Sequence, residues 1–219
     1  MNIFKINIPK QIILLLFLAI VLNIMRIVIF GSFSLIYILW NLFLALLPFL
    51  ISSLLLQQAK KVKLSRIVFI IGGIFWLLLL PNAPYLFTDL IHIGVVHNVP
   101  ALYDSVILFS SAWVGMLLGM YSLFQMEQIF KMKYSILKTN ILIVIIIFLT
   151  SFGVYLGRFL RFNSWDIFVN HFSVLRSVWG ILSQAAIHIE AYLYTILFFF
   201  FIYLSYNAWK YTQVKIPHI

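Results

Sequence analysis

The sequence predicts an all-α membrane protein in which six transmembrane helices form a bundle. Of its 219 residues, 64% are hydrophobic. Only 15 are Lys or Arg and 5 are Asp or Glu, whereas soluble domains carry about 25% charged residues. Apolar stretches of about 20 residues, the length that a helix needs to cross a bilayer, recur along the chain. An ordinary soluble globular protein is therefore excluded, and we expect a single transmembrane domain over residues 1–219 in contact with the lipid bilayer.

Five of the expected spans are uninterrupted apolar stretches, at residues 12–30, 35–56, 105–126, 139–157 and 191–209. The third span, residues 67–96, is different. Its first apolar run ends at Leu80, after about 21 Å of helix, which is too short for a bilayer core of about 30 Å. Proline removes a backbone donor and disfavours helix in the preceding residue. We therefore predict a helix that is broken at Pro81–Pro84, with Asn82 capping its second half.

The lysines predict the orientation in the membrane. They lie in alternate segments between the spans, namely Lys5 and Lys10, then Lys60, Lys61 and Lys63, then Lys131, Lys133 and Lys138, then Lys210 and Lys215. With six spans these segments share one side, which the positive-inside rule makes cytoplasmic. We expect a protein of the cell membrane with both termini in the cytoplasm. The net charge of +10 is too dilute to indicate a nucleic-acid partner, and no binding motif accompanies it.

The long segment between the fifth and sixth spans has the pattern of an amphipathic helix. Its apolar residues recur at the spacing of one helix face, at Phe168, Phe172, Leu175, Trp179 and Leu182. Asn163 is a suitable N-cap, and Asp166 follows three residues later. We predict an amphipathic helix over residues 163–182 that lies on the outer face of the membrane.

The remaining charges fall on the outer side and contain no lysine. They are four arginines and four acids, Arg26, Arg158, Arg161, Arg176, Asp89, Asp104, Asp166 and Glu190. Arginine is suited to fixed, bidentate pairing with carboxylate or phosphate, whereas lysine suits a solvated charge. Ionisable groups at membrane depth are costly and mark functional sites. We therefore expect the functional site among these outer residues.

Asp89 and His92 are the candidate catalytic residues. In an α-helix that restarts at Pro84, they share one face with Tyr85, and a carboxylate beside an imidazole can act as general acid and base. Together with His188 they are also candidate metal ligands, but a metal site needs three or more convergent ligands. The chain has no cysteine, which excludes thiolate ligands, and the sequence does not identify a cofactor.

The candidate binding residues have structural alternatives that the sequence leaves open. They are Asn82, Tyr85, Asp104, Arg158, Arg161, Asn163 and Asp166. Asp104 is alternatively the N-cap of the fourth span. Arg158 and Arg161 alternatively contact lipid phosphates or pair with Asp166. His97 and His171 read as ordinary interface residues, and the small residues Ser111, Gly115 and Gly119 indicate close helix packing.

Three stretches also carry a resemblance to a known family. They are Leu80–His92 (L-P-N-A-P-Y-L-F-T-D-L-I-H), Tyr103–Gly119 and Ser151–Asp166. Together they resemble the domain of unknown function 1361 family of bacterial integral membrane proteins. The resemblance implies a multi-pass membrane protein and no particular activity. It points to a polar set made of Asn82, Pro84, Tyr85, Asp89, His92, Asp104, Arg158, Arg161, Asn163 and Asp166.

Three functions are compatible with these features. The first is a membrane-embedded enzyme that acts on a lipid-linked or phospholipid substrate, with Asp89 or His92 as general base and Arg158 and Arg161 holding an anion. The second is a non-catalytic accessory subunit of an envelope complex, in which the charges form structural pairs. The third is a small transporter, since a broken helix is a known device for substrate sites, although no inverted repeat is visible. The sequence does not decide whether the protein is an enzyme.

Overall fold

The computed structural model describes residues 10–61, 65–94, 99–184 and 186–215, and every regular element within these ranges is helical. Six helical segments are long and apolar enough to cross a membrane, namely Lys10–Phe30, Tyr37–Lys61, Arg66–His92, Ala101–Lys133, Ile136–Phe159 and Ile189–Gln213. The prediction of an all-α protein with six membrane-spanning helices is confirmed. Lys5, Lys63, Val96 and His97 lie outside the described residues.

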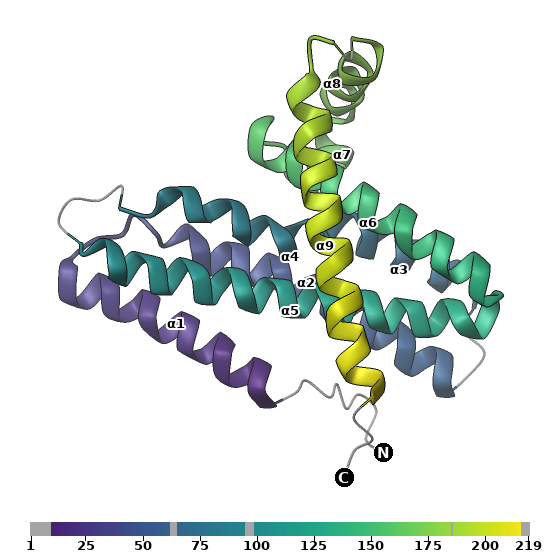
Figure 1. Cartoon of the computed structure of the whole chain (residues 1–219), viewed down its shortest axis with the longest axis horizontal. Coiled ribbons are helices and arrows are strands. Elements are labelled where there is room, and N and C mark those ends of the chain that lie inside the picture. The colour runs from purple at the N-terminus through teal and green to yellow at the C-terminus, as the bar shows by residue number, and fades with distance from the viewer. Residues whose placement is uncertain (1–9, 62–64, 95–98, 185, 216–219) are drawn as a thin grey trace. The chain divides into compact units, whose positions relative to one another are not determined.

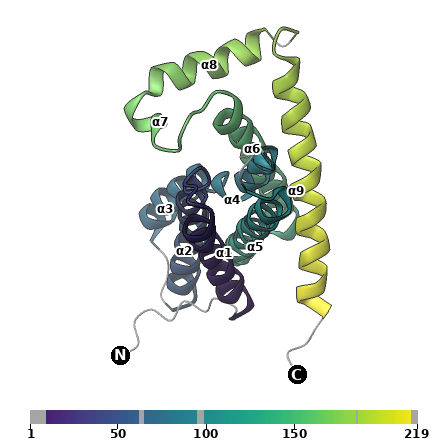
Figure 2. The same ribbon diagram turned by 90° about the vertical axis from the view of Figure 1, so that its left-hand side faces the viewer.

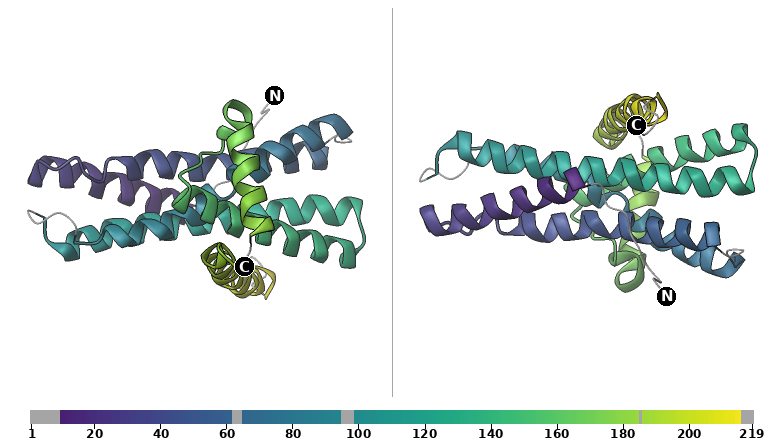
Figure 3. Two further views of the ribbon diagram at one scale, coloured as in Figure 1. Left: turned by 90° about the horizontal axis from the view of Figure 1, so that it is seen from above. Right: turned by 90° about the horizontal axis from the view of Figure 1, so that it is seen from below.

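The chain divides into two compact units, which meet in sequence between Lys133 and Tyr134. The first unit contains α1 (Lys10–Phe30), α2 (Tyr37–Lys61), α3 (Arg66–Leu79), α4 (Asn82–Tyr85), the 3₁₀ helix η1 (Leu86–His92) and α5 (Ala101–Lys133). In Figures 1 and 3, α5 runs beside α1 and α2. Their buried side chains form one apolar cluster with those of α4 and η1, including Leu42, Phe49, Ala83 and Leu118.

The third span is broken where the sequence predicts, but the chain does not restart as a new α-helix. Leu80 and Pro81 keep helical backbone angles, with φ of −57° for both. The chain therefore continues through the short helix α4 into the 3₁₀ helix η1. An N-cap residue itself has extended backbone, whereas Asn82 is already the first residue of α4. Instead it donates from Nδ2 to the carbonyl oxygen of Leu79 at 2.8 Å, so the predicted capping role of Asn82 is wrong.

Two glycines of α5 allow the broken segment to approach closely. A Cβ atom at Gly115 would lie 2.6 Å from the carbonyl oxygen of Ala83 and 2.6 Å from Cδ1 of Leu86. A Cβ atom at Gly119 would lie 3.0 Å from Cβ of Ala83. The small-residue ridge on α5 therefore serves packing within the chain, because glycine lets two backbones come together without a side chain between them.

The second unit contains α6 (Ile136–Phe159), α7 (Asp166–Val169), α8 (His171–Ser183) and α9 (Ile189–Lys215). Aromatic rings join α6 to α9, with the ring centroids of Phe159 and Tyr194 4.4 Å apart. Tyr155, Ile181 and Ala191 form a small buried cluster of α6, α8 and α9. Figure 2 shows α8 running across the end of α9.

The amphipathic helix begins later than predicted. It starts at Asp166 rather than near Asn163, and Asn170 separates α7 from α8 with backbone angles of φ −129° and ψ 40°. Asn163 does not cap it. Instead, the backbone N–H of Asn163 donates to the carboxylate of Asp166. This is one of the two reciprocal hydrogen bonds of a capping box, the one from the backbone to the acidic side chain.

Candidate functional site

Asp89 is buried on η1, with only 1% of its surface exposed. Its Oδ2 accepts a hydrogen bond of 3.0 Å from Nδ2 of Asn41, which lies on α2. A 3₁₀ helix turns by about 120° per residue, so residues three apart eclipse one another. Asp89 and His92 therefore share a face, as predicted, whereas Tyr85 lies about a third of a turn away from it. The predicted three-residue face is wrong for Tyr85 because the helix is 3₁₀ and not α.

His92 contacts the same helix as Asp89. Its ring packs edge-on against the ring of Tyr37, with 5.8 Å between the two centroids. Tyr37 and Asn41 are four residues apart on α2 and therefore face the same way. One face of the start of α2 thus receives both candidate catalytic side chains of η1. Sequence reasoning missed Tyr37 and Asn41, because an uncharged polar residue in an apolar span gives little signal.

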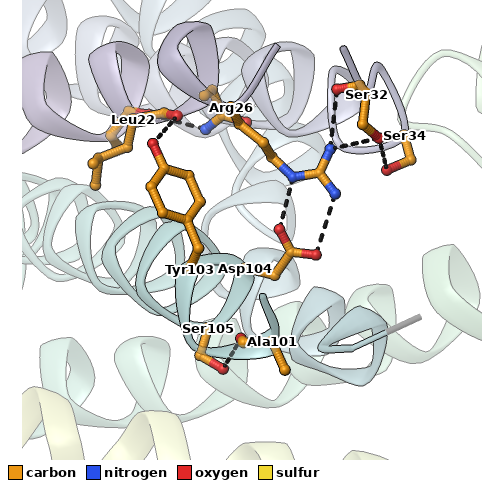
Figure 4. A network of polar contacts seen from close by, with 10 residues as sticks. Leu22, Arg26, Ser32, Ser34, Ala101, Tyr103, Asp104 and Ser105 are labelled. Atoms are coloured by element: carbon orange, nitrogen blue, oxygen red, sulfur yellow. Dashed lines mark hydrogen bonds and ion pairs between the residues drawn. The ribbon is translucent and has the colours of Figure 1, made fainter. Parts of the chain in front are cut away.

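Asp104 forms a buried ion pair with Arg26 of α1, which Figure 4 shows. Nε of Arg26 lies 2.7 Å from Oδ1 of Asp104, and Nη2 lies 3.2 Å from Oδ2. Nη1 donates to the backbone oxygen and to the hydroxyl of Ser32, both at 3.0 Å. The side chains of Arg26 and Asp104 are 1% and 0% exposed. This bidentate geometry satisfies both charges within the protein.

The pair corrects the alternative reading of Asp104. Helix α5 begins at Ala101, so Asp104 lies within its first turn and is not its N-cap. Tyr103 adds a second link to α1 by donating its hydroxyl to the carbonyl oxygen of Leu22 at 3.3 Å. The sequence places Arg26 among the outer charges but does not mark it as a site residue. An arginine inside an apolar span signals that a partner must exist, but it does not identify the partner.

A second buried network joins α2, α3 and α5, and the sequence analysis did not predict it. Nε1 of Trp76 donates to the hydroxyl of Ser122 at 2.7 Å. The hydroxyls of Ser52 and Ser122 are 3.0 Å apart, and Ser52 donates to Oε1 of Gln125 at 2.6 Å. Such uncharged groups hold helices together where lipid supplies no hydrophobic drive between them. These polar side chains form hydrogen bonds with one another, so we regard the network as structural.

The candidate residues of the second unit are arranged differently from the expected pairs. Arg158 lies in the last turn of α6 and is half-buried, and Arg161 is exposed. Arg161 has a left-handed backbone with φ of 57°, a conformation that glycine adopts far more readily. Asp166 receives the backbone N–H of Asn163, and within the described ranges no ion pair joins Asp166 to Arg161. The expected pairing of Arg161 with Asp166 is therefore wrong, and the expected contact of Arg161 with lipid phosphates stays a prediction.

The candidate metal ligands are divided between the two units. Asp89 and His92 lie in the first unit, and His188 precedes α9 in the second. Among the residues that the structure describes, no group of three or more His, Asp or Glu side chains is placed to hold a metal ion.

Comparison with known proteins identifies the family. Residues 40–205 match the family described as Protein of unknown function (DUF1361). The chain belongs to this family. Asp89, His92 and Asp104 lie within the matched part of this DUF1361 protein, whereas Arg26 lies before it. No curated protein and no solved structure matches the chain.

Proposed function

We propose that this protein is a membrane-embedded enzyme that acts on a lipid-linked or phosphate-bearing substrate at the outer leaflet of the cell membrane. The observation that carries the proposal is the buried carboxylate of Asp89, which lies on a short 3₁₀ helix with His92 on the same face. Burial of a carboxylate is costly, and an irregular helical segment at membrane depth is typical of functional sites. The orientation, with both termini in the cytoplasm, is part of this proposal.

The proposed chemistry is general acid–base catalysis. Asp89 or His92 would take a proton from an attacking hydroxyl group or water, and the neighbouring group would return one to the leaving oxygen. Asn41 orients the carboxylate through its hydrogen bond to Oδ2. The ring of Tyr37 packs edge-on against the imidazole of His92 and so limits the orientations that the imidazole can take.

The test is to delete the gene in the native host and to compare the lipids and lipid-linked intermediates of the two strains by mass spectrometry. Complementation with the wild-type protein should remove any species that accumulates, and Asp89→Asn or His92→Gln should not. Asp89→Asn keeps the shape of the side chain and an oxygen for Asn41. The matched control is Glu190→Gln, the same change at an exposed acid of α9. Full complementation by Asp89→Asn, at equal amounts in the membrane, refutes the proposal.

One observation favours a non-catalytic accessory subunit as the second candidate. The ion pair between Arg26 and Asp104 is bidentate and buried, as expected of a charge pair that holds helices together. In an accessory subunit, all functional effects of the outer charges act through folding. The exchange Arg26→Asp with Asp104→Arg should then restore function wherever it restores the amount of protein, and Asp89→Asn should impair function only when it lowers that amount.

A further inference from the structure

Helix α8 carries an apolar surface whose side chains are largely exposed in the part of the chain that the structure describes. Its buried residues, Val174 and Ile181, are 8% and 3% exposed, and they lie within about 20° of each other around the helix axis. Four other apolar side chains lie within an arc of about 80° on another side. They are Phe172, Leu175, Trp179 and Leu182, at 78%, 64%, 72% and 60% exposure. The surface available to a partner is thus separate from the face that packs.

One exposed arginine lies beside this surface on α8, and a second lies in the segment between α6 and α7. The first, Arg176, lies about 60° from Trp179 around the helix axis, and the second is Arg161, which follows α6. Both side chains are exposed, and neither has an ion-pair partner among the described residues. Asp166 is the acid nearest to Arg161 in sequence, and its carboxylate accepts a hydrogen bond from the backbone N–H of Asn163. Arg176 therefore presents an uncompensated guanidinium group beside the apolar face of α8, and Arg161 is a second uncompensated guanidinium group of the same unit.

We infer that α8, with Arg161 and Arg176, is a binding surface for anionic phospholipid. The apolar arc enters the boundary between headgroups and acyl chains, and the arginines contact the lipid phosphates. Tryptophan, phenylalanine and leucine on one face with arginine beside them are the composition of helices that lie in a membrane surface. Guanidinium groups bind phosphate in a bidentate manner. The inference goes beyond the proposed function and does not depend on Asp89.

The first test measures what surrounds each face of α8 in the full-length protein. The chain has no cysteine, so single cysteine substitutions can carry a spin label without further changes. We expect labels at Leu175→Cys and Trp179→Cys in lipid nanodiscs to be accessible to oxygen and protected from a water-soluble nickel reagent. The label at Ser177→Cys, on the opposite side of the helix, should show a lower ratio of oxygen to nickel accessibility. Low accessibility to both reagents at Leu175 and Trp179 means that protein covers the face, and it overturns the inference.

The second test asks whether the lipid is anionic. A fluorophore is attached at Leu175→Cys in nanodiscs that contain equal amounts of phosphatidylglycerol and phosphatidylcholine. Two preparations are compared. In one the phosphatidylglycerol carries brominated chains that quench the fluorophore, and in the other the phosphatidylcholine does. We expect stronger quenching by brominated phosphatidylglycerol. The enrichment should fall about fivefold for each arginine removed, because a cationic side chain contributes about that factor at an anionic surface. Arg176→Gln and Arg161→Gln test this, and Arg66→Gln, an exposed arginine at the start of α3, is the control. Equal quenching by both lipids in the unmodified background overturns the inference.

Discussion

Replacing Asp104 with asparagine removes one charge of a pair that water does not reach. Arg26 and Asp104 have exposed fractions of 1% and 0%, so the guanidinium group left behind stays buried without its counter-charge. Loss of one partner of a buried ion pair costs about 3–5 kcal/mol. A folded domain is stable by only about 5–15 kcal/mol, so Asp104→Asn should remove about a fifth or more of the stability of the first unit.

The assay is unfolding of the purified protein in mixed micelles as the fraction of denaturing detergent rises. Loss of helix is followed by circular dichroism. Glu190→Gln is the control, because this acid is exposed on α9, and a substitution at an exposed position changes the free energy of unfolding by about 0.5 kcal/mol or less.

A double substitution separates the charge effect from packing. Apolar residues can replace a buried ion pair with little loss or with a gain in stability. Arg26→Met combined with Asp104→Leu should therefore recover most of the stability that Asp104→Asn loses. The reasoning is refuted if Asp104→Asn costs less than about 1 kcal/mol, the value of a solvent-exposed pair.

Three further substitutions test the packing, the buried network and the backbone of the second unit. Gly115→Ala should lower the free energy of unfolding by about 1–3 kcal/mol, since its Cβ would meet the carbonyl oxygen of Ala83 at 2.6 Å. Gly73→Ala, where nothing lies within 4 Å, should not destabilise the protein in the same unfolding assay. Trp76→Phe removes the indole N–H that donates at 2.7 Å and should cost about 1 kcal/mol or more, with unchanged stability contradicting the network. Arg161→Gly should stabilise the second unit by about 1–2 kcal/mol, because glycine adopts the left-handed backbone at φ 57° more readily than arginine, and hydrogen exchange at the end of α6 would show it.

The spans could be predicted from the sequence because hydropathy over about 20 residues is a local property. The break in the third span could also be predicted, since Pro81 and Pro84 each lack a backbone donor. The form of the break could not. In the structure Ala83 and Leu86 lie against Gly115 of α5, a contact between residues far apart in sequence that no local pattern shows. Because the segment continues as a 3₁₀ helix, Tyr85 does not share the face of Asp89 and His92.

The partners of the charged residues were the least predictable part of the site. Arg26 and Asp104 are 78 residues apart, and no periodicity relates them. The expectation that Asp104 is an N-cap used only its own neighbours in sequence, whereas its carboxylate is directed by the packing of α1 against α5. Similarly, Asn41 and Tyr37 are ordinary residues of α2 until the fold brings η1 beside them.

The proposed role of Asp89 and His92 is tested most directly with purified protein in proteoliposomes. The substrate is the lipid species that accumulates in the deletion strain, and its conversion is followed by mass spectrometry. The wild-type protein and Glu190→Gln should convert it at the same rate, and Asp89→Asn should convert it at least about 100-fold more slowly, the lower range for loss of a general acid or base. Conversion by Asp89→Asn at the wild-type rate would contradict the assignment of Asp89 as a catalytic residue.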